Sequence, residues 1–79
     1  MTLYNQYIVY PEGDIQEITN TLTVDRIVGL NGVPLQLPLP TPKMIAYRVS
    51  KVVKREKKGE VNRYYYLELL TRKDMLEYT

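Results

Sequence analysis

The residues that could do chemistry in this 79-residue chain are carboxylates, tyrosines and a cluster of lysines and arginines, since histidine and cysteine do not occur. Without those two types the commonest general base, the thiol nucleophile and the usual zinc ligands are missing. Glu12 with Asp14, or Glu56 with Glu60, could be imagined as an acid and base. Each pair flanks a turn glycine, however, which is typical of solvated turn residues.

Two other catalytic patterns also fail. The only serine, Ser50, lies in a strand-like run and has no histidine to activate it. The four glycines lie too far apart for a phosphate-binding loop, and neither common glycine motif occurs. We therefore expect no enzyme, no cofactor, no metal site and no small-molecule substrate.

The most suggestive chemistry is basic and aromatic. Residues 43–63 hold eight basic against two acidic residues, a net charge of +6, whereas residues 1–42 carry −3 and residues 64–79 carry −1. Three consecutive tyrosines follow the basic stretch. We predict that binding is concentrated on Lys51, Val53, Lys54, Arg55, Lys57, Lys58, Arg63, Tyr64, Tyr65 and Tyr66.

Two kinds of ligand suit these residues. Exposed tyrosine beside arginine is enriched where protein interfaces concentrate binding energy, and the acidic N-terminal half of a second copy would complement the charge. Stacking of bases on tyrosine beside cations is how many small β-folds hold single-stranded nucleic acid. We predict a protein partner or self-association, with single-stranded nucleic acid as the alternative. A plainer interpretation is that lysines at a hairpin tip only discourage aggregation.

A long hairpin over residues 44–70 must position this surface. A three-residue loop ending in Gly59, with positive φ, would set Glu56 opposite Glu60 and Arg48 opposite Glu68. A two-residue turn at Lys58-Gly59 shifts every pair by one and sets Arg48 against Leu69, so the longer loop is favoured. That register places Lys51, Arg55, Arg63 and Tyr65 on one face, and Lys54, Tyr64 and Tyr66 on the other, with Val52 opposite Tyr64 and Ala46 opposite Leu70.

The N-terminal segment predicts a second hairpin. Its strands are residues 3–10 and 15–18, with Val9 opposite Ile15 as the core contact. In the turn, Pro11 presets φ and Gly13 supplies a left-handed residue.

Residues 19–32 fit two interpretations. One is a single helical turn, capped by Thr23 and ended by Gly29. The other is a hairpin around Asn31-Gly32, with Val28 opposite Leu35 and Leu30 opposite Val33. Both hold if the helical turn ends before Val28, and we adopt that combination.

The stretch VPLQLPLPTP, residues 33–42, has proline only at even positions. In an extended strand every missing N–H donor would then lie on one edge, which predicts a protected edge strand with Leu35, Leu37 and Leu39 facing the core. A polyproline ligand is the alternative, but the P-x-x-P spacing does not occur.

Thr71-Arg72-Lys73-Asp74 resembles a capping box and predicts a short helix through Tyr78, docked by Met75, Leu76 and Tyr78. Together these segments predict one α+β, mostly β domain over residues 1–79. Its sheet is a small curled antiparallel sheet or partly open barrel of five to six strands, with the short C-terminal helix. No apolar run approaches the roughly 20 residues that span a membrane, and we expect a cytoplasmic protein.

Overall fold

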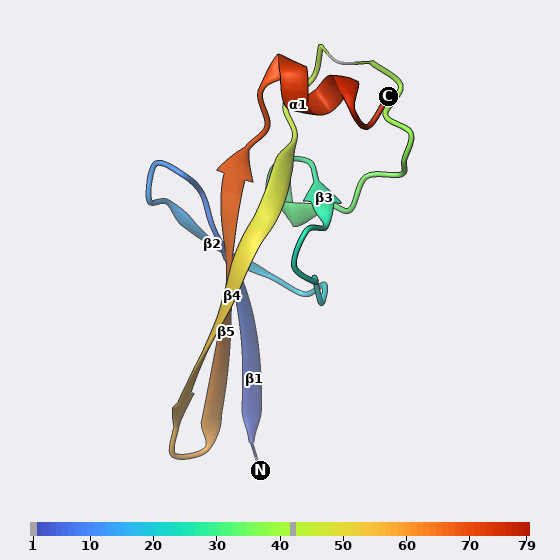
Figure 1. Ribbon diagram of the computed structural model, residues 1–79. Coiled ribbons are helices and arrows are strands. Elements are labelled where there is room, and N and C mark those ends of the chain that lie inside the picture. The colour runs from blue at the N-terminus through green and yellow to red at the C-terminus, as the bar shows by residue number, and fades with distance from the viewer. Residues whose placement is uncertain (1, 42) are drawn as a thin grey trace.

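The structure, a computed structural model, describes residues 2–41 and 43–79, which form one curled five-stranded sheet and a short C-terminal helix (Figure 1). This confirms the predicted mostly β class. The strands stand in the order β2-β1-β5-β4-β3. The elements are β1 (Leu3–Val9), β2 (Ile15–Ile18), β3 (Ile27–Val28), the 3-10 turn η1 (Leu30–Gly32), β4 (Tyr47–Lys57), β5 (Glu60–Leu69) and α1 (Arg72–Leu76).

One pairing differs from the antiparallel sheet that we expected. β1 lies between β2 and β5 and runs parallel to β5, from Leu3 beside Glu60 to Val9 beside Tyr66. The parallel pair brings Ile8 and Tyr65 to the same side of the sheet, where both are fully buried. The sheet is therefore mixed, and its centre joins two strands from opposite ends of the chain.

The hairpin register combines the two that the sequence allowed. The turn is Lys58-Gly59, with Lys57 opposite Glu60 and φ of +76° at Gly59, so the positive φ is confirmed and the three-residue loop is wrong. A β-bulge at Ser50 then adds one residue to β4 and restores Arg48 opposite Glu68. Beyond the bulge each predicted pair shifts by one, so that Val52 lies opposite Tyr65.

The two faces of the sheet differ in what covers them. The packed face carries the main core, which consists of Ile8, Ile18, Leu22, Val28, Tyr47, Val49, Tyr65 and Leu67. We call the opposite face of β1, β2, β4 and β5, from the Ser50 bulge to the hairpin tip, the open face. By alternation along the strands it consists of Leu3, Asn5, Tyr7 and Val9 in β1, Ile15 and Glu17 in β2, Lys51, Val53, Arg55 and Lys57 in β4, and Glu60, Asn62, Tyr64 and Tyr66 in β5.

The N-terminal hairpin has the predicted strands and turn. Gly13 has φ of +101°, and the Tyr10 N–H donates to the Asp14 carbonyl at 2.8 Å. Val9 does pair with Ile15, but the expected core contact is wrong, because Ile15 is 59% exposed on the open face. The core contribution of this hairpin comes instead from Ile8 and Ile18.

The predicted helical turn in residues 23–29 is wrong, whereas the chain does reverse at Asn31-Gly32. The Asp25 N–H donates to the Val49 carbonyl at 2.8 Å, so the backbone that a helix would use pairs with β4 instead. Asn31 and Gly32 have φ of +64° and +71°. Val28 bridges to Pro34 rather than to Leu35, one position from the expected partner.

The proline-rich segment is not the predicted edge strand. In its described part, residues 33–41, only Pro34 makes a bridge; Pro42 lies outside the described residues. With β3 only two residues long there is little strand to pair with, and the segment runs past α1, where the Leu39 N–H donates to the Tyr78 carbonyl. Leu39 is buried there, but Leu37 is 53% exposed.

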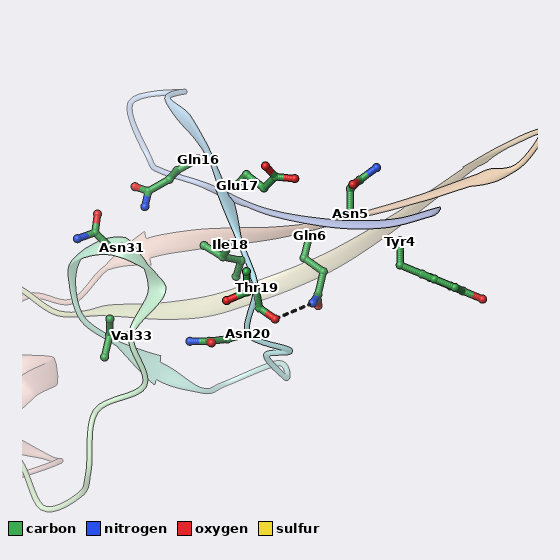
Figure 2. Close-up of a pocket in the computed structure, with 10 residues that line it drawn as sticks. All are labelled: Tyr4, Asn5, Gln6, Gln16, Glu17, Ile18, Thr19, Asn20, Asn31 and Val33. Atoms are coloured by element: carbon green, nitrogen blue, oxygen red, sulfur yellow. Dashed lines mark hydrogen bonds between the residues drawn. The ribbon is translucent and has the colours of Figure 1, made fainter. Parts of the chain in front are cut away.

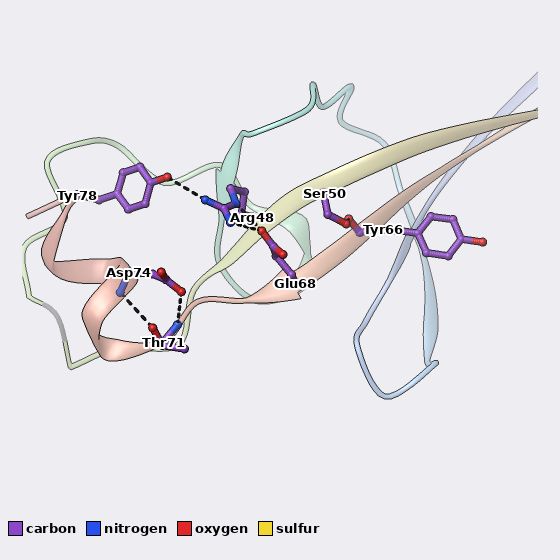
Figure 3. Close-up of polar contacts among 7 residues, drawn as sticks. All are labelled: Arg48, Ser50, Tyr66, Glu68, Thr71, Asp74 and Tyr78. Atoms are coloured by element: carbon purple, nitrogen blue, oxygen red, sulfur yellow. Dashed lines mark hydrogen bonds and ion pairs between the residues drawn. The ribbon is translucent and has the colours of Figure 1, made fainter.

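The C-terminal helix begins as predicted, with a capping box (Figure 3). The Asp74 N–H donates to Thr71 Oγ1, and the Thr71 N–H donates to Asp74 Oδ2, both at 3.1 Å. Met75 is buried in a second cluster with Ile27, Leu39, Ala46 and Leu70. The expected docking through Leu76 is wrong, since its side chain is exposed.

Candidate interaction surface

Part of the sheet extends away from both core clusters and forms what we call the arm: residues 3–5 of β1, 53–57 of β4 and 60–63 of β5. The molecule is 44 Å long against 23 and 16 Å in its other dimensions, and the hairpin tip and N-terminal strand share one end of it (Figure 1). β2 pairs with β1 only from Gln6 onward, and β3 pairs with β4 at Tyr47 and Arg48, far from the tip. Neither β2 nor β3 therefore pairs with an outer edge of the arm.

β1 is the part of this surface that sequence reasoning missed. Tyr4 is 75% exposed and Leu3 is 60% exposed, although neither was singled out in the sequence. The pattern of residues 3–9 predicts a strand, and this is the signal that could have found Leu3 and Tyr4. The pattern does not reveal that this strand lies beside β5.

The ten predicted binding residues divide between the two faces in a different way from that expected. The open face takes Lys51, Val53, Arg55, Lys57, Tyr64 and Tyr66, so tyrosines and cations lie together there. Lys54 and Arg63 pair with each other on the opposite face, and Lys58 lies in the turn.

Tyr65 is wrong as a binding residue. Its side chain is fully buried in the main core, and its hydroxyl donates to Gln6 Oε1. The two-residue turn moves it from the partner position of Lys51 to that of Val52, which faces the core.

Aromatic and cationic groups make direct contacts on the open face. The rings of Tyr7 and Tyr64 stack with centroids 5.1 Å apart and an interplanar angle of 18°. Lys51 Nζ lies 4.7 Å from the centroid of the Tyr66 ring, a cation–π distance. These contacts hold the rings flat across neighbouring strands.

A row of amides continues the open face toward the tip. Asn5 Nδ2 donates to Asn62 Oδ1 at 3.0 Å and to Glu60 Oε1 at 3.1 Å. Asn62 is only 6% exposed, so this hydrogen bond satisfies a buried polar group in the middle of the arm. Glu60, which the sequence offered as one half of an acid and base pair, accepts a hydrogen bond from Asn5.

The electrostatics of the face are uneven. Burial raises the pKa of the Tyr7 hydroxyl, and the nearby Glu17, Tyr64 and Glu60 raise it further. The Tyr7 hydroxyl is therefore protonated at neutral pH. Glu17 lies beside Tyr7 on β2, whereas Lys51 and Arg55 lie across the sheet on β4.

The base of the hairpin is anchored by a polar network (Figure 3). Arg48 donates to Glu68, which confirms the predicted opposite-charge pair, and reaches the Tyr78 hydroxyl at 3.5 Å. These two hydrogen bonds raise the pKa of Arg48 above its ordinary value. The Ser50 hydroxyl donates to the Tyr66 carbonyl at 3.0 Å, so the bulge is tied across the two strands.

A hollow of about 660 Å³ lies along β1 and β2 (Figure 2). Its walls are rich in amides, and Glu17 is the carboxylate among its lining residues. Gln6 is already engaged, since its Nε2 donates to the Thr19 carbonyl at 3.4 Å and its Oε1 accepts from Tyr65.

Within residues 2–41 and 43–79, no group of three or more acidic side chains gathers in a way that could hold a metal ion. Glu56, the other carboxylate considered from the sequence, lies 3.0 Å from Lys54 Nζ. No helix in the described part of the chain is long and apolar enough to cross a membrane.

Residues 2–78 match a family described as "Uncharacterised Treponema protein". The chain belongs to this family. Comparisons with curated proteins and with solved structures gave no match.

Proposed function

We propose that the protein is a non-catalytic interaction module that binds another polypeptide through its arm and open face. The observation that carries the proposal is the open face itself, where half-buried tyrosines and Val53 lie beside Lys51 and Arg55. Neither core cluster, as far as the described residues go, includes these side chains. Aromatic residues with arginine nearby are the types that concentrate binding energy in protein interfaces.

Single-stranded nucleic acid is the alternative ligand, favoured by the cations along β4. The ring contacts support it less well. Tyr65 is in the core, Tyr64 has one ring face covered by Tyr7, and Lys51 lies over Tyr66, so bases would find few free rings on which to stack.

Two matched double variants test the proposal. Val53→Ser with Tyr64→Ala removes the apolar and aromatic contact, whereas Lys57→Glu with Lys58→Glu reverses charge at the tip. The full chain, immobilised, is compared with both variants for retention of polypeptides and of a 20-nucleotide oligothymidylate. We expect the first variant to weaken polypeptide binding by a hot-spot increment of about 2 kcal/mol or more.

The charge-reversed variant should change mainly the association rate and its salt dependence. If charge reversal abolished all binding while the apolar variant bound normally, the polypeptide proposal would be wrong. Oligothymidylate binding that weakens steeply with salt would then identify nucleic acid as the ligand.

A further inference from the structure

We propose that a second copy of this chain covers the open face, in a two-fold symmetric dimer whose axis runs parallel to β1 and β5. The inference rests on the proposed function, because it names the partner that the interaction surface would bind. Three features carry it: an uncovered face, matching residues on its two central strands, and opposite charges on its two sides.

The uncovered face is the first feature. Neither core cluster, in the part of the chain that the structure describes, includes a side chain of the open face. Leu3 and Ile15 are largely exposed there, and α1 lies beyond the end of β5 rather than over the face (Figure 1). Burying this aliphatic and aromatic surface would drive association.

Matching residues on the central strands are the second feature. In the parallel register, Asn5 lies beside Asn62 and Tyr7 lies beside Tyr64. A two-fold axis parallel to the strands keeps their direction and exchanges β1 with β5 of the second copy. Tyr7 would then meet Tyr64 of the second copy, and Asn5 would meet Asn62 of the second copy. A symmetric interface requires such a self-complementary patch.

Charge is the third feature. The register aligns Glu17, Tyr7, Tyr64 and Val53 in one row across the sheet. The same axis exchanges β2 with β4, so Glu17 would face Val53 of the second copy. Lys51 and Arg55 lie two residues to either side of Val53, roughly 7 Å away along the strand. Each glutamate would thus lie between two cations, once on each side of the axis.

Pairing through the β4 edge is another way in which two copies could meet. In an antiparallel pair of β4 strands, the cations at residues 51, 54, 55 and 57 would lie close to the same cations of the second copy. Like charges opposite one another are destabilising, so this edge disfavours a second copy. The charge pattern therefore favours the open face over the β4 edge.

The test uses charge reversal and complementation, with molar mass measured by sedimentation equilibrium. The full chain should sediment as a dimer at micromolar concentration. Glu17→Lys alone, or Lys51→Glu with Arg55→Glu, places like charges at both symmetric contacts, and each should weaken dimerisation by at least about tenfold.

An equimolar mixture of these two variants should form a heterodimer, because Lys at position 17 then faces Glu at 51 and 55, and the other contact keeps its native charges. Lys54→Glu with Lys58→Glu is the matched control, since it reverses two charges off the open face and should leave the dimer intact.

Three results would overturn the inference: a monomeric wild-type chain, a mixture that fails to restore the dimer, or a control that dissociates as readily as the face variants. A monomer that still retains a different polypeptide, in a manner sensitive to Val53→Ser with Tyr64→Ala, would leave the proposed function standing. Loss of that sensitivity is what would remove the proposed function itself.

Discussion

The neighbouring tyrosines Tyr64 and Tyr65 should have opposite roles, and a pair of alanine variants separates them. Tyr65 is fully buried in the main core, and truncating a buried aromatic side chain destabilises by about 3 to 5 kcal/mol. The whole domain has a stability of about 4 to 12 kcal/mol at typical values per residue. Tyr65→Ala should therefore remove a large share of it. Tyr64→Ala loses a half-exposed ring and its stack on Tyr7, about 1 kcal/mol.

Urea unfolding followed by circular dichroism measures the difference. With a denaturant slope near 1 kcal/mol per molar urea for a chain of this size, Tyr65→Ala should lower the midpoint by about 3 M or more. Because that variant could fail to fold, Tyr65→Phe serves as a second measure: it keeps the packing, loses the hydrogen bond to Gln6, and should cost about 1 kcal/mol. The face assignment is refuted if Tyr64→Ala destabilises as much as Tyr65→Ala.

Three further outcomes can be checked with the same unfolding assay. Gly59→Ala should destabilise by about 1 kcal/mol, because alanine is strained at a φ of +76°; an unchanged midpoint would contradict the turn. Leu39→Ala should lower the free energy of unfolding by about 2 to 4 kcal/mol and Leu37→Ala by less than about 0.5 kcal/mol. Equal losses would contradict the difference in burial between these two leucines. Backbone and side-chain hydrogen bonds with Thr71 lower the pKa of Asp74, so its stabilising contribution is present above the ordinary carboxyl pKa and is lost as pH falls through the lowered value. Asp74→Asn should lose less stability than wild type between pH 5 and pH 2, and parallel pH curves would argue against the capping box.

Local patterns predicted what depends on neighbours in the sequence. The turn glycines Gly13 and Gly59, both strands of the N-terminal hairpin and the Thr71 capping box all rely on residues within a few positions of one another. Local patterns failed on the length of the hairpin loop and on the helical turn at residues 23–29, and other failures depend on distant partners. Whether Leu37 or Leu39 faces the core is decided by α1, which lies more than thirty residues later in the chain.

The central pairing of the sheet was beyond sequence reasoning for the same reason. Tyr7 and Tyr64 lie side by side because β1 inserts parallel to β5. The alternation of apolar and polar residues in each strand does not show which strand lies next to it. The candidate surface was therefore predicted only as far as the hairpin reached. Its cations and Tyr64 could be named, but Tyr7, Asn5 and Glu17, which complete the open face, could not.

The bulge at Ser50 explains how the hairpin can satisfy two registers. With the turn fixed at Lys58-Gly59 and no bulge, Arg48 would lie opposite Leu69 and would point to the packed face, where a charge is costly to bury. One extra residue keeps Arg48 with Glu68 while Val49 and Val52 both face the core side. On the other side of the bulge, the two-residue turn sets Lys51 beside Tyr66 on the open face, with Val53 and Arg55 following at alternate positions. The turn thus determines the chemistry of the open face, and the bulge lets the base of the hairpin keep a different register for its own packing.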